Sequence, residues 1–431
     1  MKKTIIKSGY LLAVFILALL IISSVVNQGN TDMTMEMGQA TFPVVHMYVG
    51  GREVNSLYGY KDTMECSYQR ECITPLGEGR KVRIRVDKYD QEIEDMVFEV
   101  RSIDGERLVE STKITMYEET QDNISAEIQI KDLIDADTEY MLVLSLKNEW
   151  DQTIRYYTRI IQTEDYFEKE KLDYVMDFHE RTFDKEAARE LTKYLESNAE
   201  GDNTTFSRVT IHSSFHQVTW GDLQVNRLTE PKVTIKEMGS QTGSLELDYV
   251  VSLKDGRNED LYTVKEFYRV RYTPDRIYLL DFERTMKQVF QEDGEVFANN
   301  KIELGIIAPE DVKLAESDGG NVLAFTDGKR LFSYNVADNK LSTLFSFYNG
   351  DYEDERVCRQ KHGIKILNVD EAGNVQFIVY GYMNRGKHEG EVGITVYYYN
   401  GMMNTVEEML YVPENSSYEV LHAEMEELAY I

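Results

Sequence analysis

The stretch from Gly381 to Lys387, GYMNRGK, fits the first seven positions of a loop that cradles phosphate groups. Such a loop continues with Ser or Thr, which reaches magnesium, and it opens a helix whose N-terminal amides hold the phosphates. Here His388 follows, and the sequence after it, GEVGITVYYYN, predicts a strand. We therefore expect a charged hairpin tip at this place rather than a nucleotide site.

Two histidines in HSSFH, His212 and His216, have the spacing that can share a zinc ion when both lie on one face of a helix. The flanking sequences RVTI and QVTW predict strand instead, and residues four apart on a strand lie about 13 Å apart. The Glu of the HExxH motif is also missing. We therefore predict no metal site here and interpret both residues as surface or hydrogen-bonded histidines.

The three cysteines offer little metal chemistry. Cys66 and Cys72 lie in ECSYQREC, and Cys358 stands alone. A C-x5-C spacing without a second pair is not a zinc signature. Two interpretations stay open, a short extracytoplasmic disulfide loop between Cys66 and Cys72 or two free thiols. The sequence has no nucleophile elbow, dinucleotide fingerprint or EF-hand loop, so we predict no catalytic residue and no cofactor.

The N-terminus holds an uncharged apolar run at residues 9–26, behind three lysines. At about 1.5 Å per residue, a helix of this length spans about 27 Å, close to the roughly 30 Å hydrocarbon core of a bilayer. Lysines before the run and acids after it predict a cytoplasmic tail at 1–8, a transmembrane signal anchor at 9–26 and a polar tether at 27–40. A cleavable signal peptide is the alternative, but no A-x-A-like site follows. Both interpretations export the rest of the chain, and the anchor places it at the cell membrane.

Length and composition describe a globular chain with a strongly acidic surface. The 431 residues suffice for two to four domains, and a hydrophobic share of 42% suffices for their cores. The formal net charge is −29, from 76 acidic and 47 basic residues. Such a surface repels nucleic acid and anionic lipid headgroups, so we predict no nucleic-acid partner.

Residues 41–163 alternate apolar and polar positions in short runs between turns, which predicts an antiparallel β-sandwich. Within this region, LIDADTEYMLVLSL places Ile134, Thr138 and Tyr140 at the spacing of the corner before a late strand. The stretch resembles that corner in fibronectin type III-like and immunoglobulin-like domains. The resemblance covers about a dozen residues and implies a hydrogen bond from the Tyr hydroxyl back to the backbone; it implies a fold and no activity.

Residues 164–300 change from a helical to a strand period. In FDKEAARELTKYLESN the apolar residues fall on one helical face with Asp184 as N-cap, and YFEKEKLDYVMDFHE predicts a second helix. Alternation then returns from Leu245 to Leu253 and continues through YTVKEFYRVRY and RIYLLDFER. Helices followed by consecutive hairpins predict an α+β domain with helix packed on a curled antiparallel sheet.

Residues 301–431 contain a loose internal repeat. GNVLAF at 320 and GNVQFIVYGY at 373 correspond, and YNVADNKLSTLF at 334 corresponds to YNGMMNTVEEML at 399. Repeats of about 50 residues made of short strands resemble β-propeller blades. Two blades cannot close a ring of about four to eight, and the end EELAYI looks strand-like. We therefore expect an incomplete propeller-like region, either truncated or completed by another chain.

These features together predict a mainly β, multidomain fold with an N-terminal transmembrane helix. The layout is similar to that of membrane-anchored envelope proteins of Gram-positive bacteria. We expect a single-pass membrane-anchored extracytoplasmic protein with a binding or regulatory role. Its expected partners are the lipid bilayer, through residues 9–26, and an envelope protein or a wall polymer. A cell-envelope hydrolase that uses the propeller-like region and a structural tether are the alternatives.

Overall fold

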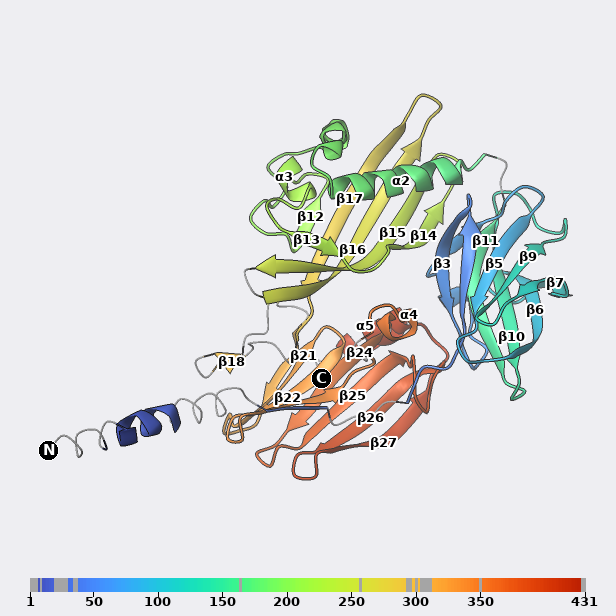
Figure 1. Ribbon diagram of the computed structural model, residues 1–431. Helices are drawn as coiled ribbons and strands as arrows, with labels where there is room; N and C mark the ends of the chain where they lie inside the picture. The colour runs from blue at the N-terminus through green and yellow to red at the C-terminus, as the bar shows by residue number, and fades with distance from the viewer. Residues whose placement is uncertain are drawn as a thin grey trace.

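The computed structural model of the chain describes residues 7, 10–18, 30–33, 38–162, 165–255, 258–291, 297–298, 301–302, 312–348 and 351–427. The described residues form a mainly β, multidomain molecule with several separate sheets, as the alternating sequence patterns predict (Figure 1).

The first part of the described body contains two five-stranded sheets. The strands of the first, in spatial order, are β3 (Arg52–Tyr58), β2 (Val44–Val49), β5 (Lys81–Asp87), β9 (Asn123–Gln129) and β8 (Glu118–Glu119). Those of the second are β4 (Ile73–Pro75), β11 (Thr153–Ile161), β10 (Glu139–Asn148), β6 (Ile93–Ser102) and β7 (Leu108–Lys113). Inward-facing side chains of both sheets share one hydrophobic core, so the sheets form a sandwich.

Tyr140 lies at the start of β10 and is 2% exposed. Its hydroxyl accepts a hydrogen bond from the backbone N–H of Asp135 at 3.1 Å and lies 3.2 Å from the Asp135 carboxylate. This is the bond back to the preceding backbone that the resemblance to fibronectin- and immunoglobulin-like domains implies, while membership of those families stays a prediction.

The middle part is a six-stranded antiparallel sheet covered by a helix (Figure 1). The sheet orders β12 (Arg208–Thr210), β17 (Ile277–Gln288), β16 (Asn258–Tyr272), β15 (Thr242–Asp255) and β13 (Val225–Arg227), and β14 (Lys232–Met238) also pairs with β15. Helix α2 (Glu168–Thr182) packs its apolar side on β15 and β16. The helix predicted for FDKEAARELTKYLESN forms as the 3₁₀ helix η2 (Ala187–Tyr194), with Glu186 rather than Asp184 at the N-cap position. The Asp184 carboxylate still accepts from the amides of Glu186 and Ala187 at the start of this helix.

The last part contains two four-stranded antiparallel meanders. The first meander comprises β20 (Leu314–Glu316), β21 (Val322–Asp327), β22 (Arg330–Asn335) and β23 (Lys340–Phe345). The second comprises β24 (His362–Val369), β25 (Val375–Tyr382), β26 (Val392–Asn400) and β27 (Thr405–Pro413). Apolar residues of both meanders share one core, which includes Leu344, Phe345, Phe377 and Tyr397. The short pair β18 (Phe297–Ala298) and β19 (Lys301–Ile302) precedes them.

The predicted correspondence of the two Tyr-Asn hairpins is confirmed by matching contacts. The hydroxyl of Tyr334 donates to Asn339 Oδ1 at 2.7 Å, and the hydroxyl of Tyr399 donates to Asn404 Oδ1 at 3.0 Å. Both asparagines adopt the left-handed backbone, with φ of 49° and 55°. Asn tolerates this region better than other side chains, so the same turn chemistry closes both hairpins. The likeness to propeller blades stays a prediction.

Two expectations concern the chain ends. Of the predicted strand-like end EELAYI, the first two residues end helix α5 (Tyr418–Glu427), which buries Leu421 and Met425, while 428–431 lie outside the described residues. In the predicted tether, β1 (Asn30–Met33) pairs in parallel with β23, with Asn30 opposite Lys340. This part of the segment is therefore a sheet strand rather than a free linker.

The predicted anchor at 9–26 is described only at residues 10–18, which are helical; residue 9 and residues 19–26 lie outside the described residues. Within the part of the chain that the structure describes, we find no helix with the length and apolar character needed to cross a membrane.

Candidate functional site

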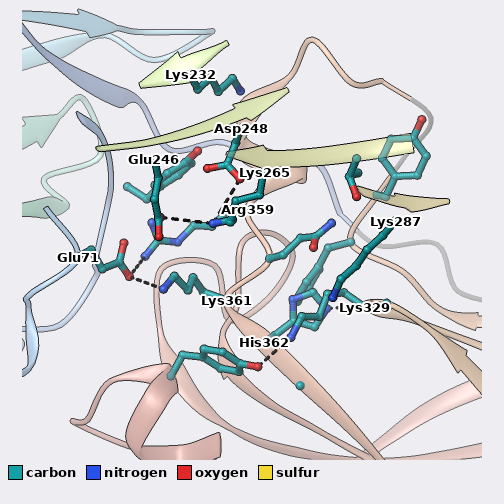
Figure 2. A pocket seen from close by; sticks show the side chains of 18 of the residues that line it. Glu71, Lys232, Glu246, Asp248, Lys265, Lys287, Lys329, Arg359, Lys361 and His362 are labelled. Carbon is teal, nitrogen blue, oxygen red and sulfur yellow. Dashed lines mark hydrogen bonds and ion pairs between the residues drawn. The ribbon is translucent and has the colours of Figure 1, made fainter. Parts of the chain in front are cut away.

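A cavity of about 1000 Å³ lies where the sandwich, the middle sheet and the meanders meet. This volume lies at the upper end of the range of small-molecule pockets. Its wall takes residues from β3 and the segment after it, from β11, from β14 to β17, from β21, β22, β24 and β25, and from α5. Figure 2 shows their side chains entering the cavity from the middle sheet on one side and from the meander region on the other.

The charge of this wall is opposite to that of the whole chain. Among the described residues, nine lysines and arginines but five acids line the cavity, whereas the complete sequence has 47 basic and 76 acidic residues. Six of the nine cations are labelled in Figure 2: Lys232, Lys265, Lys287, Lys329, Arg359 and Lys361. A concave wall with an excess of one charge concentrates ions of the opposite sign. The cavity therefore favours anions inside an otherwise anion-repelling molecule.

Strand alternation places the charges of the middle sheet in the cavity. On β15, Leu245 and Leu247 are fully buried in the core that α2 shares. Glu246 and Asp248 alternate with them along the strand and therefore face the other way, into the cavity. Lys265 pairs with Asp248 in the register of β15 and β16.

These side chains form a ladder of ion pairs on the cavity face. Lys265 Nζ lies 3.3 Å from Asp248 Oδ1 and 3.4 Å from Glu246 Oε2, and Lys236 Nζ lies 3.6 Å from Glu246 Oε2. The Asp248 side chain is 46% exposed, but it is exposed into the cavity, where the surrounding protein raises the pKa of its carboxyl. Burial opposes the charge of Lys265, and the two carboxylates nevertheless raise its pKa. The ladder thus keeps a cation at the centre of the sheet.

Arg359 lies in the cavity wall opposite the middle sheet. Its side chain is 6% exposed, and its Nη2 lies 3.1 Å from both the Tyr60 hydroxyl and Glu71 Oε1. The guanidinium also stacks over the rings of Tyr58 and Tyr382, at 4.3 and 4.6 Å from their centroids. Burial opposes this charge, but Glu71 and the tyrosines raise the pKa of Arg359 above its ordinary value. Arg359 is therefore a fixed positive charge in the wall.

Lys361 extends the positive wall next to Arg359. Its Nζ lies 3.8 Å from Glu71 Oε1 and also pairs with Glu419. Burial alone would favour the neutral form of Glu71, but Arg359 and Lys361 hold the pKa of that carboxyl below its usual value. One carboxylate thus orients two cations at the edge of the cavity.

His362 is a neutral polar group in the same wall. It is 2% exposed, and burial lowers its pKa to about 3. Its Nε2 lies 2.9 Å from the Lys329 carbonyl oxygen, so Nε2 carries the proton and Nδ1 is left as an acceptor. Nδ1 is buried and has no hydrogen-bond partner among the residues that the structure describes. A ligand hydroxyl or a water molecule could supply the missing donor.

Tyrosines complete the lining, among them Tyr60, Tyr348, Tyr380 and Tyr418. Lys329 Nζ lies 4.8 Å from the ring centroid of Tyr418 and donates to its hydroxyl at 2.8 Å. Tyrosine rings offer flat apolar contact together with a hydroxyl, which suits a ligand that carries hydroxyl groups as well as charge.

The GYMNRGK stretch covers the end of β25 and the start of the loop to β26, and no helix follows it. β25 and β26 are antiparallel neighbours, so the predicted charged hairpin connection is confirmed, but most of the loop is not exposed. Residues 383–385 and 389–391 are buried because the loop folds against the sandwich. Glu389 accepts from the amides of Thr41 and Phe42, and the Gly390 carbonyl accepts from the amide of Lys61. The loop therefore connects the second meander to the sandwich.

The strand predicted to follow His212 is wrong. Residues 215–218 form helix α3 (Phe215–Val218), capped by Ser214, whose hydroxyl accepts from the amide of Gln217. His212 Nδ1 lies 3.2 Å from the Glu196 carbonyl oxygen and 3.1 Å from Asn198 Nδ2. Neither histidine belongs to a cluster of metal-ligating side chains among the described residues.

Cys66 and Cys72 are both free and buried in the structure. Cys66 begins the short 3₁₀ helix η1 (Cys66–Tyr68), and Cys72 Sγ lies 3.4 Å from the Thr158 hydroxyl. The structure gives no support to the predicted disulfide and agrees with the alternative of two thiols.

The cavity residues escaped the sequence reasoning because they come from distant places, such as Glu71, Asp248 and Lys361. The available signal was a local reversal of charge. Lysines and arginines cluster in YTVKEFYRVRY and in ERVCRQKHGIK within a chain that is acidic overall.

Comparisons with known proteins add little. No protein-family model matches the chain, and no curated protein does so either. Among solved structures, one similar chain is the sporulation control protein Spo0M from Bacillus subtilis. It is 9% identical, the alignment covers 52% of this chain and 90% of that chain, and the TM-score is 0.16. A likeness at this level carries no argument about fold or function.

Proposed function

We propose that this protein is an extracytoplasmic binding protein, held at the cell membrane by residues 9–26, whose cavity takes an anionic ligand rich in hydroxyl groups. Anionic wall polymers have this chemistry. The observation that carries the proposal is the excess of cations around the cavity of a chain with a net charge of −29.

Two further features support the same ligand class. Nδ1 of His362, which has no partner among the described residues, can accept a hydrogen bond from a ligand hydroxyl. The tyrosines of the wall can stack on a sugar ring or a polyol and hydrogen-bond to it. The apolar run at the N-terminus supports the anchor, because an uncharged stretch of this length matches a bilayer.

The test is calorimetric titration of the full chain in detergent with poly(glycerol phosphate), polygalacturonate and neutral dextran. We expect the two polyanions to bind and dextran not to bind. The affinity should fall as sodium chloride increases, because salt screens the cations. The poly(glycerol phosphate) and polygalacturonate arms separate phosphate from carboxylate recognition.

Variants place the binding in the cavity. Lys265→Gln and Lys361→Gln should each weaken polyanion binding about tenfold, since each removes one charge from the wall. Lys254→Gln is the matched control, because Lys254 pairs with Glu259 on the same sheet but outside the cavity wall. Equal loss with the control variant, or equal binding of dextran, would refute the proposal. Release of polymer fragments would favour the alternative of a cell-envelope hydrolase.

A further inference from the structure

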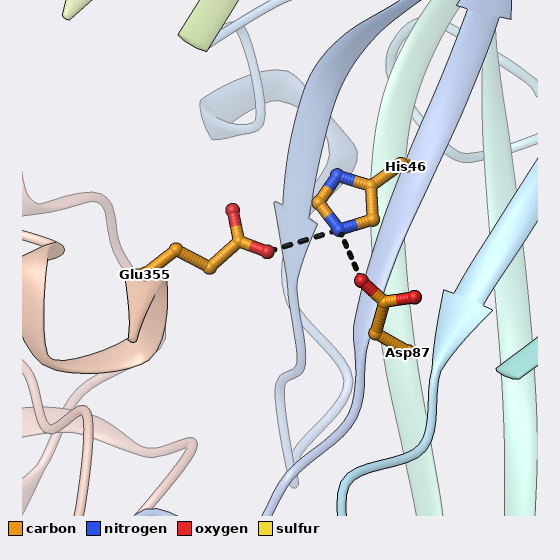
Figure 3. A group of neighbouring side chains, drawn as sticks. All are labelled: His46, Asp87 and Glu355. Atoms are coloured by element: carbon orange, nitrogen blue, oxygen red, sulfur yellow. Dashed lines mark ion pairs between the residues drawn. The ribbon is translucent and has the colours of Figure 1, made fainter. Parts of the chain in front are cut away.

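Three side chains from distant parts of the sequence converge beside the cavity, outside its wall: His46 on β2, Asp87 on β5, and Glu355 on α4 (Glu355–Cys358) (Figure 3). Their ligand atoms all lie within 4.8 Å of one another. His46 Nε2 lies 3.2 Å from Asp87 Oδ2 and 2.9 Å from Glu355 Oε1. His46 and Glu355 are 3% and 6% exposed. The group therefore has the residue types and burial of a metal site.

The geometry fits a cation better than a set of hydrogen bonds. Although both carboxylate oxygens lie close to His46 Nε2, that atom has no well-directed hydrogen bond within the described part of the chain, and neither has Glu355 Oε2. The oxygens therefore lie off the direction in which a proton on Nε2 would point. Metal–ligand bonds of about 2.1 Å give ligand separations of about 3.0 Å in an octahedron and about 3.4 Å in a tetrahedron. The two observed separations, 2.9 and 3.2 Å, lie near the lower, octahedral end of this range.

The other nitrogen of His46 is arranged as in known metal centres. Nδ1 lies 3.2 Å from the Ser56 hydroxyl and 3.3 Å from Glu53 Oε1, so a proton on Nδ1 has acceptors beside it. A metal-binding histidine commonly donates its second N–H to a carboxylate, which fixes the ring and leaves the other nitrogen for the metal. Arg85 holds Asp87 from the side through Nε and Nη2, at 2.8 and 2.9 Å.

We propose that His46, Asp87 and Glu355 bind a divalent transition-metal ion of the zinc or manganese type, which joins the sandwich to the meander region. One imidazole and two carboxylates suit these ions better than calcium, which prefers oxygen ligands alone. Three protein ligands leave a coordination position open. Lys232 extends from the cavity wall to within 3.6 Å of Glu355 Oε2, so the metal site and the anion cavity are neighbours.

The competitor for His46 Nε2 is a proton. Burial opposes the charged imidazolium, but Asp87 and Glu355 raise the pKa of His46 to about 9 in the metal-free protein. A metal must displace this proton, and binding would release it to solvent. A direct measurement of metal binding distinguishes the protonated state from the metal-bound state.

The experiment uses the full chain in detergent after treatment with EDTA and gel filtration. Titration with zinc chloride, followed by calorimetry and by metal analysis of the desalted protein, should give one ion per chain. Cobalt chloride should give the visible absorption of a nitrogen- and oxygen-ligated ion, and calcium chloride should bind at least a hundredfold more weakly.

His46→Gln, Asp87→Asn and Glu355→Gln should each weaken zinc binding at least tenfold. His212→Gln is the matched control, because His212 also lies near a carboxylate, Glu200, on the surface. Circular dichroism is used to check that each variant is folded. Wild-type protein that retains no zinc and gives no cobalt spectrum would overturn the proposal whatever the variants do, and so would unchanged affinity in all three folded variants.

Discussion

Glu389 Oε1 accepts a hydrogen bond from the backbone N–H of Phe42 at 2.9 Å, although 347 residues separate the two in sequence. The same carboxylate accepts from the amide and the hydroxyl of Thr41, at 2.6 and 2.7 Å. Glu389 belongs to the loop that joins β25 and β26, and Phe42 lies two residues before β2, the first strand of the sandwich. One carboxylate therefore fastens the second meander to the start of the sandwich.

Glu389→Ala should lower the free energy of unfolding by about 2 to 4 kcal/mol, because it leaves two buried or half-buried backbone amides without an acceptor. Urea denaturation followed by circular dichroism measures the loss. Glu407→Ala is the control, since Glu407 is exposed on β27, and its effect should stay within about 0.5 kcal/mol. Equal effects of the two substitutions would contradict the role given to Glu389.

Glu266 forms the centre of a buried polar network beneath α2. Its carboxylate accepts from Tyr249 and Tyr268 at 2.9 and 2.8 Å and lies 2.7 Å from His179 Nδ1. Glu266 and Arg284 are both fully buried, and Arg284 Nη1 lies 3.9 Å from Glu266 Oε1.

Glu266→Ala should cost about 3 to 5 kcal/mol, because it leaves the buried Arg284 charge and several donors without their partner. Thermal and urea unfolding of the variant measure this. Glu283→Ala serves for comparison, as it removes the exposed pair with Arg208 and should cost about 1 kcal/mol or less. A loss at Glu266 no larger than that at Glu283 would show that the network contributes little.

His362 predicts a specific dependence of stability on pH. Its pKa is about 3 in the folded chain and about 6.5 when unfolded, so the unfolded chain takes up the proton first as the pH falls. Stability is therefore lost as the pH drops below about 6.5 and continues to be lost toward 3.

His362→Gln should remove this contribution, which amounts to about 2 to 3 kcal/mol between pH 7.5 and pH 4.5. Comparing unfolding free energies of wild type and variant at the two pH values isolates it from the many carboxylates. His212→Gln, at a partly exposed position, controls for the loss of a histidine. Parallel pH profiles for wild type and His362→Gln would contradict the prediction.

The two cysteines near the sandwich should be slow to react. Burial raises the pKa of the Cys72 thiol to about 11 and also raises that of Cys66, so few thiolates form at pH 8. We expect Ellman's reagent to label the native chain slowly at these positions and to find three thiols after unfolding in urea. A single thiol in the unfolded chain would instead show the disulfide between Cys66 and Cys72.

Local periodicity predicted much of the fold. Alternation placed Val82, Ile84 and Val86 inside the sandwich, where all three are buried, and the Tyr-Asn correspondence predicted the equivalent hairpins of the meanders. Each of these patterns involves residues that are close together in sequence, so it can be recognised without knowing what the residues pack against.

The failures have a common physical origin in tertiary context. QVTW is rich in strand-forming residues, but the Ser214 cap and packing around buried Val218 and Trp220 select a short helix. The burial of the loop with GYMNRGK was not predicted, because its polar residues have no visible partner in the local sequence. Its partners are Thr41, Phe42 and Lys61, more than 300 residues away.

The candidate sites could not be predicted from the sequence for the same reason. His46, Asp87 and Glu355 lie on β2, β5 and α4, and no spacing rule links residues so far apart. The cavity cations likewise meet only after three parts of the chain pack together.

The entry of the chain into its folded body has a mechanical consequence. Strand β1 pairs along β23, and Glu389 accepts hydrogen bonds from the backbone just before the sandwich. A pull from the N-terminal end would thus load the C-terminal meanders first, and the sandwich would feel that force only after both fastenings had given way.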